Sequence, residues 1–265
     1  METARYGQTI SINGVRFSFH PAGHVIGSAQ IRVEHKGEVW VVSGDYKTQD
    51  DGITTPFEPV KCHHFITEST FALPVYQWQE QATVMQEINN WWKKCGEQGK
   101  VAVLTAYSLG KAQRMIQNID HNIGPVFTHK TIESTNSVIR QQGIALKPTT
   151  LVKEHHTESD LKGAMLICPP SAIDSALAKK LGPSAVAVAS GWMMLRGARR
   201  RRAADKGFVL SDHADWKGLN EAVTATGAEN IYVTHGYSEI LSKWLKEKGL
   251  NARALEIESE SDTEG

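Results

Sequence analysis

Hydrophobic and polar residues alternate with a period of two between residues 8 and 45, which is the pattern of half-buried β-strands. The pairs Asn13-Gly14 and Lys36-Gly37 separate alternating runs, and both are typical of tight hairpin turns. The segment HPAGHVIGS contains one proline and two glycines, so we expect a loop there. The predicted strands are QTISI, VRFSFH, AQIRVEH, EVWVV and, after a polar stretch, HHFITES.

The spacing of apolar residues becomes helical after Gln77. Val84, Ile88 and Trp91 fall on one side of a helix that we expect to end near Gly96. Short apolar runs then alternate with helical segments, which predicts βαβ units around a mainly parallel sheet, and hence an α/β protein. The expected strands are VAVLTAY, PVFTH, AMLICPP and AVAVASG, with helices beginning at Gly110, after His129 and at Ser171.

Two later strand-like runs each end on a histidine. GFVLSDHADW carries His213, and IYVTHGY carries His235. Because α/β proteins place their chemistry where buried strands reach the edge of a sheet, we expect both histidines to face a functional site.

Earlier strands also end near side chains that suit a metal ion. Imidazoles and carboxylates are ligands of zinc and manganese. Taken singly, a histidine at a strand end is more often a hydrogen-bonded structural residue, and spacing alone does not show convergence. The candidate set consists of His24, Asp45, Glu68, His213 and His235.

Composition narrows the choice of class. The chain has 265 residues, 40% of them apolar, which is enough for one large α/β domain or two interleaved domains. Its 29 basic and 29 acidic residues balance, so a nucleic-acid partner would need a local basic patch. No apolar run approaches the ~20 residues that cross a bilayer, and the three cysteines lack CxxC spacing. We therefore expect a soluble, cytoplasmic protein without membrane contact.

Two segments suggest contacts with phosphate. Ser108, Gly110 and Lys111 open a helix, where backbone N–H groups suit an anion, although an ordinary helix cap explains the same residues. A dense basic cluster follows later, and such a run is either a solvated face or a contact with a nucleic-acid backbone. The cluster consists of Arg196, Arg199, Arg200, Arg201 and Arg202.

Six motifs occur together in a fixed order: HPAGHVIGSAQI, VVSGDY, FITESTF, YSLGKAQRM, SDHADW and THGY. This series resembles the β-CASP branch of the metallo-β-lactamase superfamily, a group of DNA and RNA nucleases. Within that branch, the phrases VEHKGEVWVVSGDYKTQDDGITTPFEPV, SGWM and GFVLSDHADW look most like the bacterial ligase-associated DNA exonucleases. The resemblance covers essentially the whole chain.

The resemblance implies a role for each candidate. His24 matches a zinc ligand, Asp45 a carboxylate that bridges two metals, and His235 a ligand of the second zinc. His213 matches a histidine that protonates the leaving oxygen, oriented by a carboxylate that corresponds to Glu68. Two Zn²⁺ ions per complete site are implied, with Mn²⁺ as a possible substitute, and two metals with a bridging hydroxide suit phosphodiester hydrolysis.

One family signature is missing from the sequence. The string HxHxDH, which supplies most ligands of the first zinc, does not occur in the 265 residues. We therefore expect an N-terminally shortened form in which neither metal has a full set of protein ligands.

The implied architecture is a partial αββα sandwich of metallo-β-lactamase type, lacking its N-terminal strands, with an inserted β-CASP domain. We expect the sandwich at residues 1–72 and 206–265 and the insertion at residues 73–205. The implied function is a DNA exonuclease linked to repair, with a DNA ligase or helicase as a partner of the same system. The alternatives are an RNA-processing nuclease of the same family and a non-catalytic scaffold that binds nucleic acid.

Overall fold

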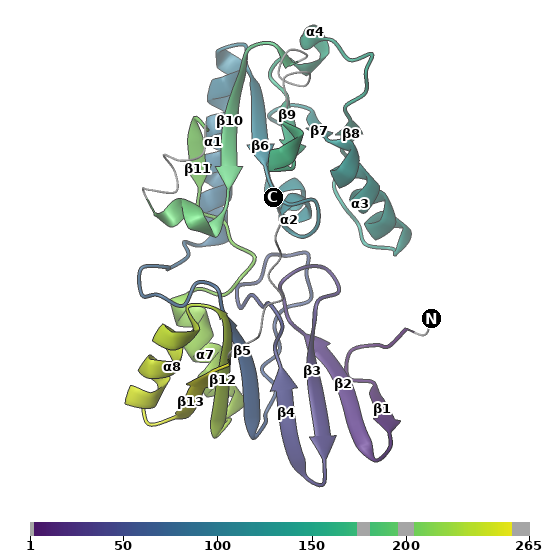
Figure 1. Cartoon of the computed structure of the whole chain (residues 1–265). Helices are drawn as coiled ribbons and strands as arrows, with labels where there is room; N and C mark the ends of the chain where they lie inside the picture. Colours follow the sequence, from purple (N-terminus) through teal and green to yellow (C-terminus); the bar gives the residue numbers. More distant parts are fainter. Residues whose placement is uncertain (1–2, 174–180, 196–203, 256–265) are drawn as a thin grey trace. The chain divides into compact units, whose positions relative to one another are not determined.

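Two β-sheets organise this chain in a computed structural model that describes residues 3–173, 181–195 and 204–255 (Figure 1). The first sheet has the strand order β1-β2-β3-β4-β5-β12-β13, and the second has the order β11-β10-β6-β9-β7-β8. Helices accompany both sheets, so the predicted α/β class is confirmed.

The chain divides into two compact units. Among the described residues, unit 1 comprises the chain up to Asp50, Thr54–Gln77 and the part from His213 onward, and unit 2 comprises Asp51–Ile53 and Trp78–Asp212. Figure 1 shows unit 1 combining purple strands from the start of the chain with yellow-green elements from its end.

Unit 1 contains the first sheet and two helices. Its elements are β1 (Thr9–Ile12), β2 (Val15–Pro21), β3 (Ala29–His35), β4 (Glu38–Val42), β5 (His64–Ser69), α7 (Trp216–Thr226), β12 (Asn230–Gly236), α8 (Ser238–Glu247) and β13 (Asn251–Ala254). The predicted hairpin turns are confirmed: Asn13 and Gly14 have φ of 50° and 80°, and Lys36 and Gly37 have φ of 50° and 85°. Two positive φ values in succession give the type I′ turn that matches strand twist.

Strand direction brings several loops of unit 1 to one edge. β4, β5 and β12 are parallel neighbours, and β2 runs in the same direction as β4 because two antiparallel pairings separate them. The carboxyl ends of all four strands therefore lie at the same edge of the sheet. The strands also carry buried apolar residues, including Val41, Phe65 and Ile231. These residues form one hydrophobic core with Leu219 of α7 and Leu241 of α8.

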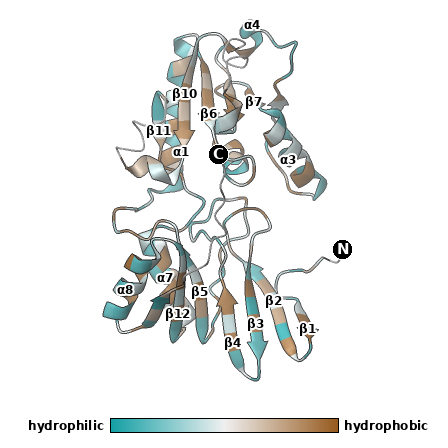
Figure 2. Cartoon of the chain, viewed as in Figure 1, coloured by the Kyte–Doolittle hydropathy of each residue, from teal (hydrophilic) through white to brown (hydrophobic). Residues whose placement is uncertain are grey.

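Unit 2 is built around the second sheet, in which every pairing is parallel. Figure 2 shows β6 and β10 as largely hydrophobic, as expected for strands covered on both faces. Its elements are α1 (Gln81–Glu97), β6 (Val101–Thr105), α2 (Lys111–Asn118), β7 (Val126–Thr128), α3 (Lys130–Gln141), β8 (Thr150–Leu151), α4 (Glu158–Leu161), β9 (Met165–Cys168), β10 (Ser184–Ala189) and β11 (Lys206–Phe208), with 3₁₀ turns at Pro170–Ala172 and Gly191–Met194.

The run that begins at Gly207 belongs to unit 2. Gly207 and Phe208 end β11, which pairs with β10 in the second sheet. Residues 206–212 fall in unit 2. Helix α7 was not predicted, because its start directly after SDHAD was read as part of a strand. The helix expected from Ser171 runs into residues 174–180, which lie outside the described part of the chain.

None of the described helices is both long enough and apolar enough to cross a membrane.

Candidate metal centre

The loop that carries His24 is tied to the loop that follows β4. The Lys47 N–H donates to the carbonyl oxygen of Ala22 at 3.1 Å. Gly23 has φ of +71°, and a Cβ added there would lie 2.4 Å from the carbonyl oxygen of Lys47. Only glycine therefore allows the two loops to approach this closely, and the approach brings His24 toward Asp45.

Glu68 at the end of β5 and His213 before α7 form a tight pair. Both carboxylate oxygens of Glu68 lie 2.9 Å from Nδ1 of His213, and the Glu68 side chain is 2% exposed. Burial in itself would raise the pKa of Glu68, but hydrogen bonds from His213, from the Thr70 N–H and from the Tyr46 N–H hold that pKa below its usual value. The carboxylate is thus ionised at neutral pH and accepts the Nδ1 proton of the ring.

Tyr46 connects this pair to the Asp45 loop. Its N–H donates to Oε1 of Glu68 at 2.9 Å, and its carbonyl oxygen accepts the N–H of Ala214 at 2.7 Å. The side chain is fully buried, and its hydroxyl lies 3.0 Å from Oγ1 of Thr67. Burial raises the pKa of the Tyr46 hydroxyl, which stays protonated. The backbone of Tyr46 therefore fixes the position of Asp45, which precedes it, relative to His213, which precedes Ala214.

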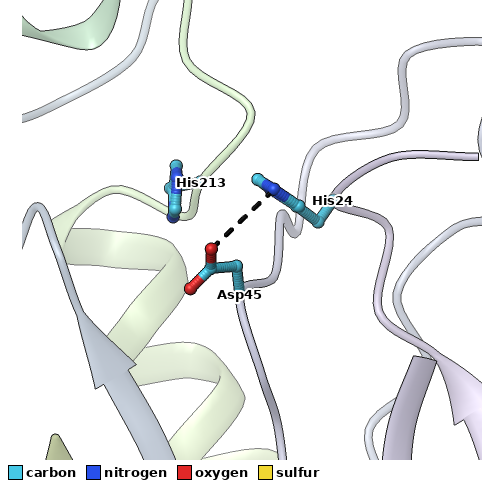
Figure 3. A group of neighbouring side chains, drawn as sticks. All are labelled: His24, Asp45 and His213. Carbon is cyan, nitrogen blue, oxygen red and sulfur yellow. Dashed lines mark ion pairs between the residues drawn. The ribbon is translucent and has the colours of Figure 1, made fainter. Parts of the chain in front are cut away.

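Three predicted site residues converge on one space, as Figure 3 shows. His24, Asp45 and His213 each offer one potential ligand atom, and these atoms all lie within 4.8 Å of one another. Nε2 of His24 is 3.9 Å from Oδ2 of Asp45, and the two imidazole rings have centroids 4.7 Å apart with a tilt of 60°. The two histidine side chains are 21% exposed and that of Asp45 is 47% exposed, so solvent can reach the group.

The structure does not bring His235 into this group of three. Its side chain is exposed, and its φ of 55° places it in the left-handed region at an irregularity in the pairing of β12 with β5. The Ser69 hydroxyl donates to the carbonyl oxygen of His235, and a Cβ at Gly236 would lie 2.5 Å from the carbonyl oxygen of Ser69. A bulge re-aims side chains at a strand end, and a sequence pattern does not reveal it.

The three residues predicted to bind phosphate have partners within unit 2. The Ser108 hydroxyl donates to Oγ1 of Thr131 at 3.2 Å, and the Gly110 N–H donates to a glutamine side chain at 2.8 Å. Nζ of Lys111 lies 3.2 Å from Oδ2 of Asp212, and both side chains are 7% exposed. These groups cap α2 and neutralise a buried carboxylate, which favours the structural alternative over a phosphate site.

The basic cluster at Arg196 and Arg199–Arg202 lies outside the described residues. Its proposed contact with nucleic acid remains a prediction from the sequence.

Comparison with known proteins gives sequence relatives but no family assignment by model, since no family model matches the sequence. The chain is 32% identical over 256 residues to a "Probable DNA ligase" of Opitutus terrae, covering 94% of this chain and 24% of that protein. It is 28% identical over 122 residues to "Cleavage and polyadenylation specificity factor 73" of Drosophila melanogaster, and 31% identical over 126 residues to "Endoribonuclease YSH1" of Yarrowia lipolytica. Each of these two matches covers 45% of this chain, and 18% and 14% of the respective relatives. The chain thus spans a quarter or less of the length of the curated relatives it matches.

A solved structure shares the fold. A protein of unknown function from Enterococcus faecalis superimposes with a TM-score of 0.65 at 10% identity, covering 97% of this chain and 66% of that one. At this identity the similarity describes the architecture alone.

Proposed function

We propose, from the homology of this chain to proteins of the β-CASP branch of the metallo-β-lactamase superfamily, that it hydrolyses phosphodiester bonds in nucleic acid with a bound metal ion. The observation that carries the proposal is the convergence of His24, Asp45 and His213 from three separate segments at one sheet edge. Within this class we propose a DNA exonuclease linked to repair, at work in the cytoplasm beside a DNA ligase or helicase.

The donor set fits a divalent metal. The imidazole of His24 and the carboxylate of Asp45 suit Zn²⁺ or Mn²⁺, and open positions beside the protein ligands are typical of catalytic sites rather than closed structural ones. The exposure of Asp45 supports the same reading, because a substrate phosphate and water need access to the open positions. We take zinc as the metal. When bound, it would polarise a phosphate oxygen and favour ionisation of a water molecule.

The residues of this chain divide the remaining work. His24 and Asp45 hold the ion, with their loops fixed by the Lys47 to Ala22 hydrogen bond. Glu68 fixes the orientation and tautomer of His213 through Nδ1, so that the other nitrogen of the ring is the one available for chemistry. The burial of Glu68 strengthens that pairing, because its carboxylate has little water to compete with the imidazole.

The two units support a matching proposal for architecture. We propose that unit 1 is the partial metallo-β-lactamase sandwich and that unit 2 is the inserted β-CASP domain. The support is the composition of unit 1 from both ends of the chain, with an all-parallel α/β unit inserted between them.

The nucleic-acid class is tested by digestion of labelled single strands. Single-stranded DNA and RNA of the same sequence are incubated with the protein and Zn²⁺ or Mn²⁺, with EDTA as the control. We expect stepwise shortening of the DNA from one end that stops in EDTA. Preferential cleavage of the RNA would instead support the RNA-processing alternative, which the names of two relatives favour. Equal activity in EDTA would refute a metal-dependent reaction.

The non-catalytic alternative follows from the absence of HxHxDH in the sequence. Elemental analysis of the purified protein separates the two readings. Retention of about one or more zinc ions per chain would contradict a scaffold that has lost its metal centre, and a metal-free protein that cannot be reloaded with zinc would contradict the enzyme.

A further inference from the structure

Two aromatic side chains of unit 2, Tyr107 and Trp192, lie in loops at the carboxyl edge of the second sheet. We infer, on the basis of the proposed action on nucleic acid, that both bind the bases of a single strand by stacking. They hold the strand without reading its sequence, because every base has an aromatic face.

The two loops lie where the connections of the second sheet change direction. β6 and β10 are parallel neighbours with Thr105 opposite Val188, so the loops that follow these strands start at the same edge. From β6 the chain passes through α2 to β7, beyond β9, whereas from β10 it goes to β11 on the opposite side. Open α/β sheets bind their ligands beyond the carboxyl ends of the strands at such a switch point.

Large apolar side chains are exposed in these same loops. Among the described residues of unit 2, the exposed large apolar side chains are Tyr107 at 71%, Leu109 at 47%, Val138 at 55% and Trp192 at 37%. All except Val138, which belongs to α3, lie in the loops after β6 and β10. Exposed apolar side chains that occur together mark binding surfaces, whereas single ones need no explanation.

The 3₁₀ turn at Gly191–Met194 places Trp192 on the surface. The next residue, Met193, is buried and packs against Gly207 of β11, where an added Cβ would lie 2.8 Å from the Met193 Sδ. The Ser190 hydroxyl accepts the Trp192 N–H at 3.3 Å and caps the turn. Because Met193 anchors the turn to the sheet, the neighbouring Trp192 remains exposed.

Lys111 supports the ring of Tyr107. Its ammonium lies over the ring, 5.3 Å from the centroid, as in a cation–π contact. The same ammonium lies 3.2 Å from Oδ2 of Asp212, and both of these side chains are buried, so the lysine is itself fixed within unit 2. A ring held in this way loses little conformational freedom when a base stacks on it, which favours binding.

Exposed rings suit a single strand rather than a duplex. In a duplex the bases cover one another, and proteins contact groove edges and phosphates. In a single strand the bases can separate and stack on tyrosine or tryptophan. Neighbouring strands of a sheet lie ~4.8 Å apart, so loops that follow two of them can contact nearby nucleotides of one strand.

Fluorescence anisotropy of labelled oligonucleotides tests the stacking. The full chain is added, in EDTA to prevent cleavage, to a single-stranded DNA of mixed sequence, to the corresponding duplex and to a strand of equal length that lacks bases. In Tyr107→Ala and in Trp192→Ala the Kd for the single strand should rise by about 5–100-fold, the effect of losing one stacked base. The Kd values for the duplex and for the base-free strand should not change.

Phenylalanine at either position keeps a stacking ring and should keep the affinity of the wild type. Val138→Ala removes another exposed apolar side chain of unit 2 and is the matched control. The single strand should also quench the tryptophan emission of the wild type more than that of Trp192→Phe. Circular dichroism shows whether each variant is folded, and leucine replaces alanine at a position where the alanine variant does not fold.

Unchanged single-strand affinity in either alanine variant overturns the inference and leaves the exposed ring to a protein partner. An equal loss of affinity for the base-free strand also overturns it, because that loss comes from backbone contacts or from the fold. Binding that depends on both rings, together with no cleavage of DNA or RNA, keeps the stacking site and removes the nuclease. Metal-dependent cleavage with an unchanged KM in both alanine variants keeps the nuclease and removes the stacking site.

Discussion

Replacing Gly23 with alanine should separate the two loops that hold His24 and Asp45. The new Cβ would lie 2.4 Å from the Lys47 carbonyl oxygen, a backbone atom that cannot rotate away. At φ of +71° an alanine also adopts the left-handed region at a cost of roughly 1–2 kcal/mol. Relief of the overlap would break the hydrogen bond from Lys47 to Ala22, which contributes about 0.5–1.5 kcal/mol. The sum is a destabilisation of roughly 1.5–3.5 kcal/mol for Gly23→Ala.

Gly27 supplies a matched control in the same loop. Its φ is +81°, but an added Cβ would meet no atom within 4 Å, so Gly27→Ala carries the backbone strain without the overlap. Urea unfolding followed by circular dichroism should show a larger loss for Gly23→Ala than for Gly27→Ala, and the Zn²⁺ affinity should fall in the first variant alone. Equal losses of stability and equal metal affinities in the two variants would refute the claim that close loop contact positions His24.

Three other changes test separate parts of the molecule. Asp212→Asn should cost about 3 kcal/mol in urea unfolding, because it leaves the buried charges of Lys111 and Arg114 without their carboxylate, and a loss below about 1 kcal/mol would contradict this. Burial alone would raise the pKa of Glu133, but hydrogen bonds from two threonines, an arginine and an asparagine hold it below its usual range. These hydrogen bonds therefore stabilise the fold at pH values above the pKa of Glu133 in the unfolded chain, and the stabilisation is lost as pH falls through the lower pKa of the folded state. Glu133→Gln should make the free energy of unfolding less dependent on pH in this acid range. An unchanged pH dependence would contradict the reasoning. Serine at Arg199–Arg202 should lower the slope of log affinity against log salt by about 0.7–0.9 for each arginine that contacts a phosphate, and an unchanged slope would return the run to a solvated face.

Local sequence patterns predicted most strands because they report burial directly. The alternation in residues 8–45 reflects one buried and one less buried face, and the turn pairs at Asn13-Gly14 and Lys36-Gly37 carry the positive φ values that hairpins need. Helix α1 likewise spans Gln81–Glu97, close to the predicted end at Gly96. In each case the signal lies within a few residues of the structure it specifies.

Tertiary contacts are the part of the structure that no local pattern reveals. GFVL has the apolar character of a strand, but the sheet that it joins depends on pairing with β10, which the run itself does not encode. Lys111 opens a helix as a phosphate-binding lysine would, and its partner in the structure is Asp212, about a hundred residues later. His235 ends a strand as a ligand would, and the irregular pairing of β12 with β5 and the hydrogen bond from Ser69 set its backbone conformation. None of these partners is visible from the residue's own neighbours.

The pairing of His213 with Glu68, which the family resemblance implies, joins residues that lie far apart in the chain. His24, Asp45 and Glu68 all precede Trp78–Asp212, the long segment of unit 2, and His213 is the first residue of unit 1 after that segment. Closing a loop of this length costs conformational entropy. Direct contacts at the point where the chain returns to unit 1 offset that cost and fix the imidazole ring of His213. The backbone of Tyr46 provides them, since its N–H holds Glu68 and its carbonyl oxygen holds Ala214. Asp45 lies directly before Tyr46 in the chain. One set of hydrogen bonds, made by the backbone of Tyr46, therefore positions both the Asp45 carboxylate and the His213 imidazole.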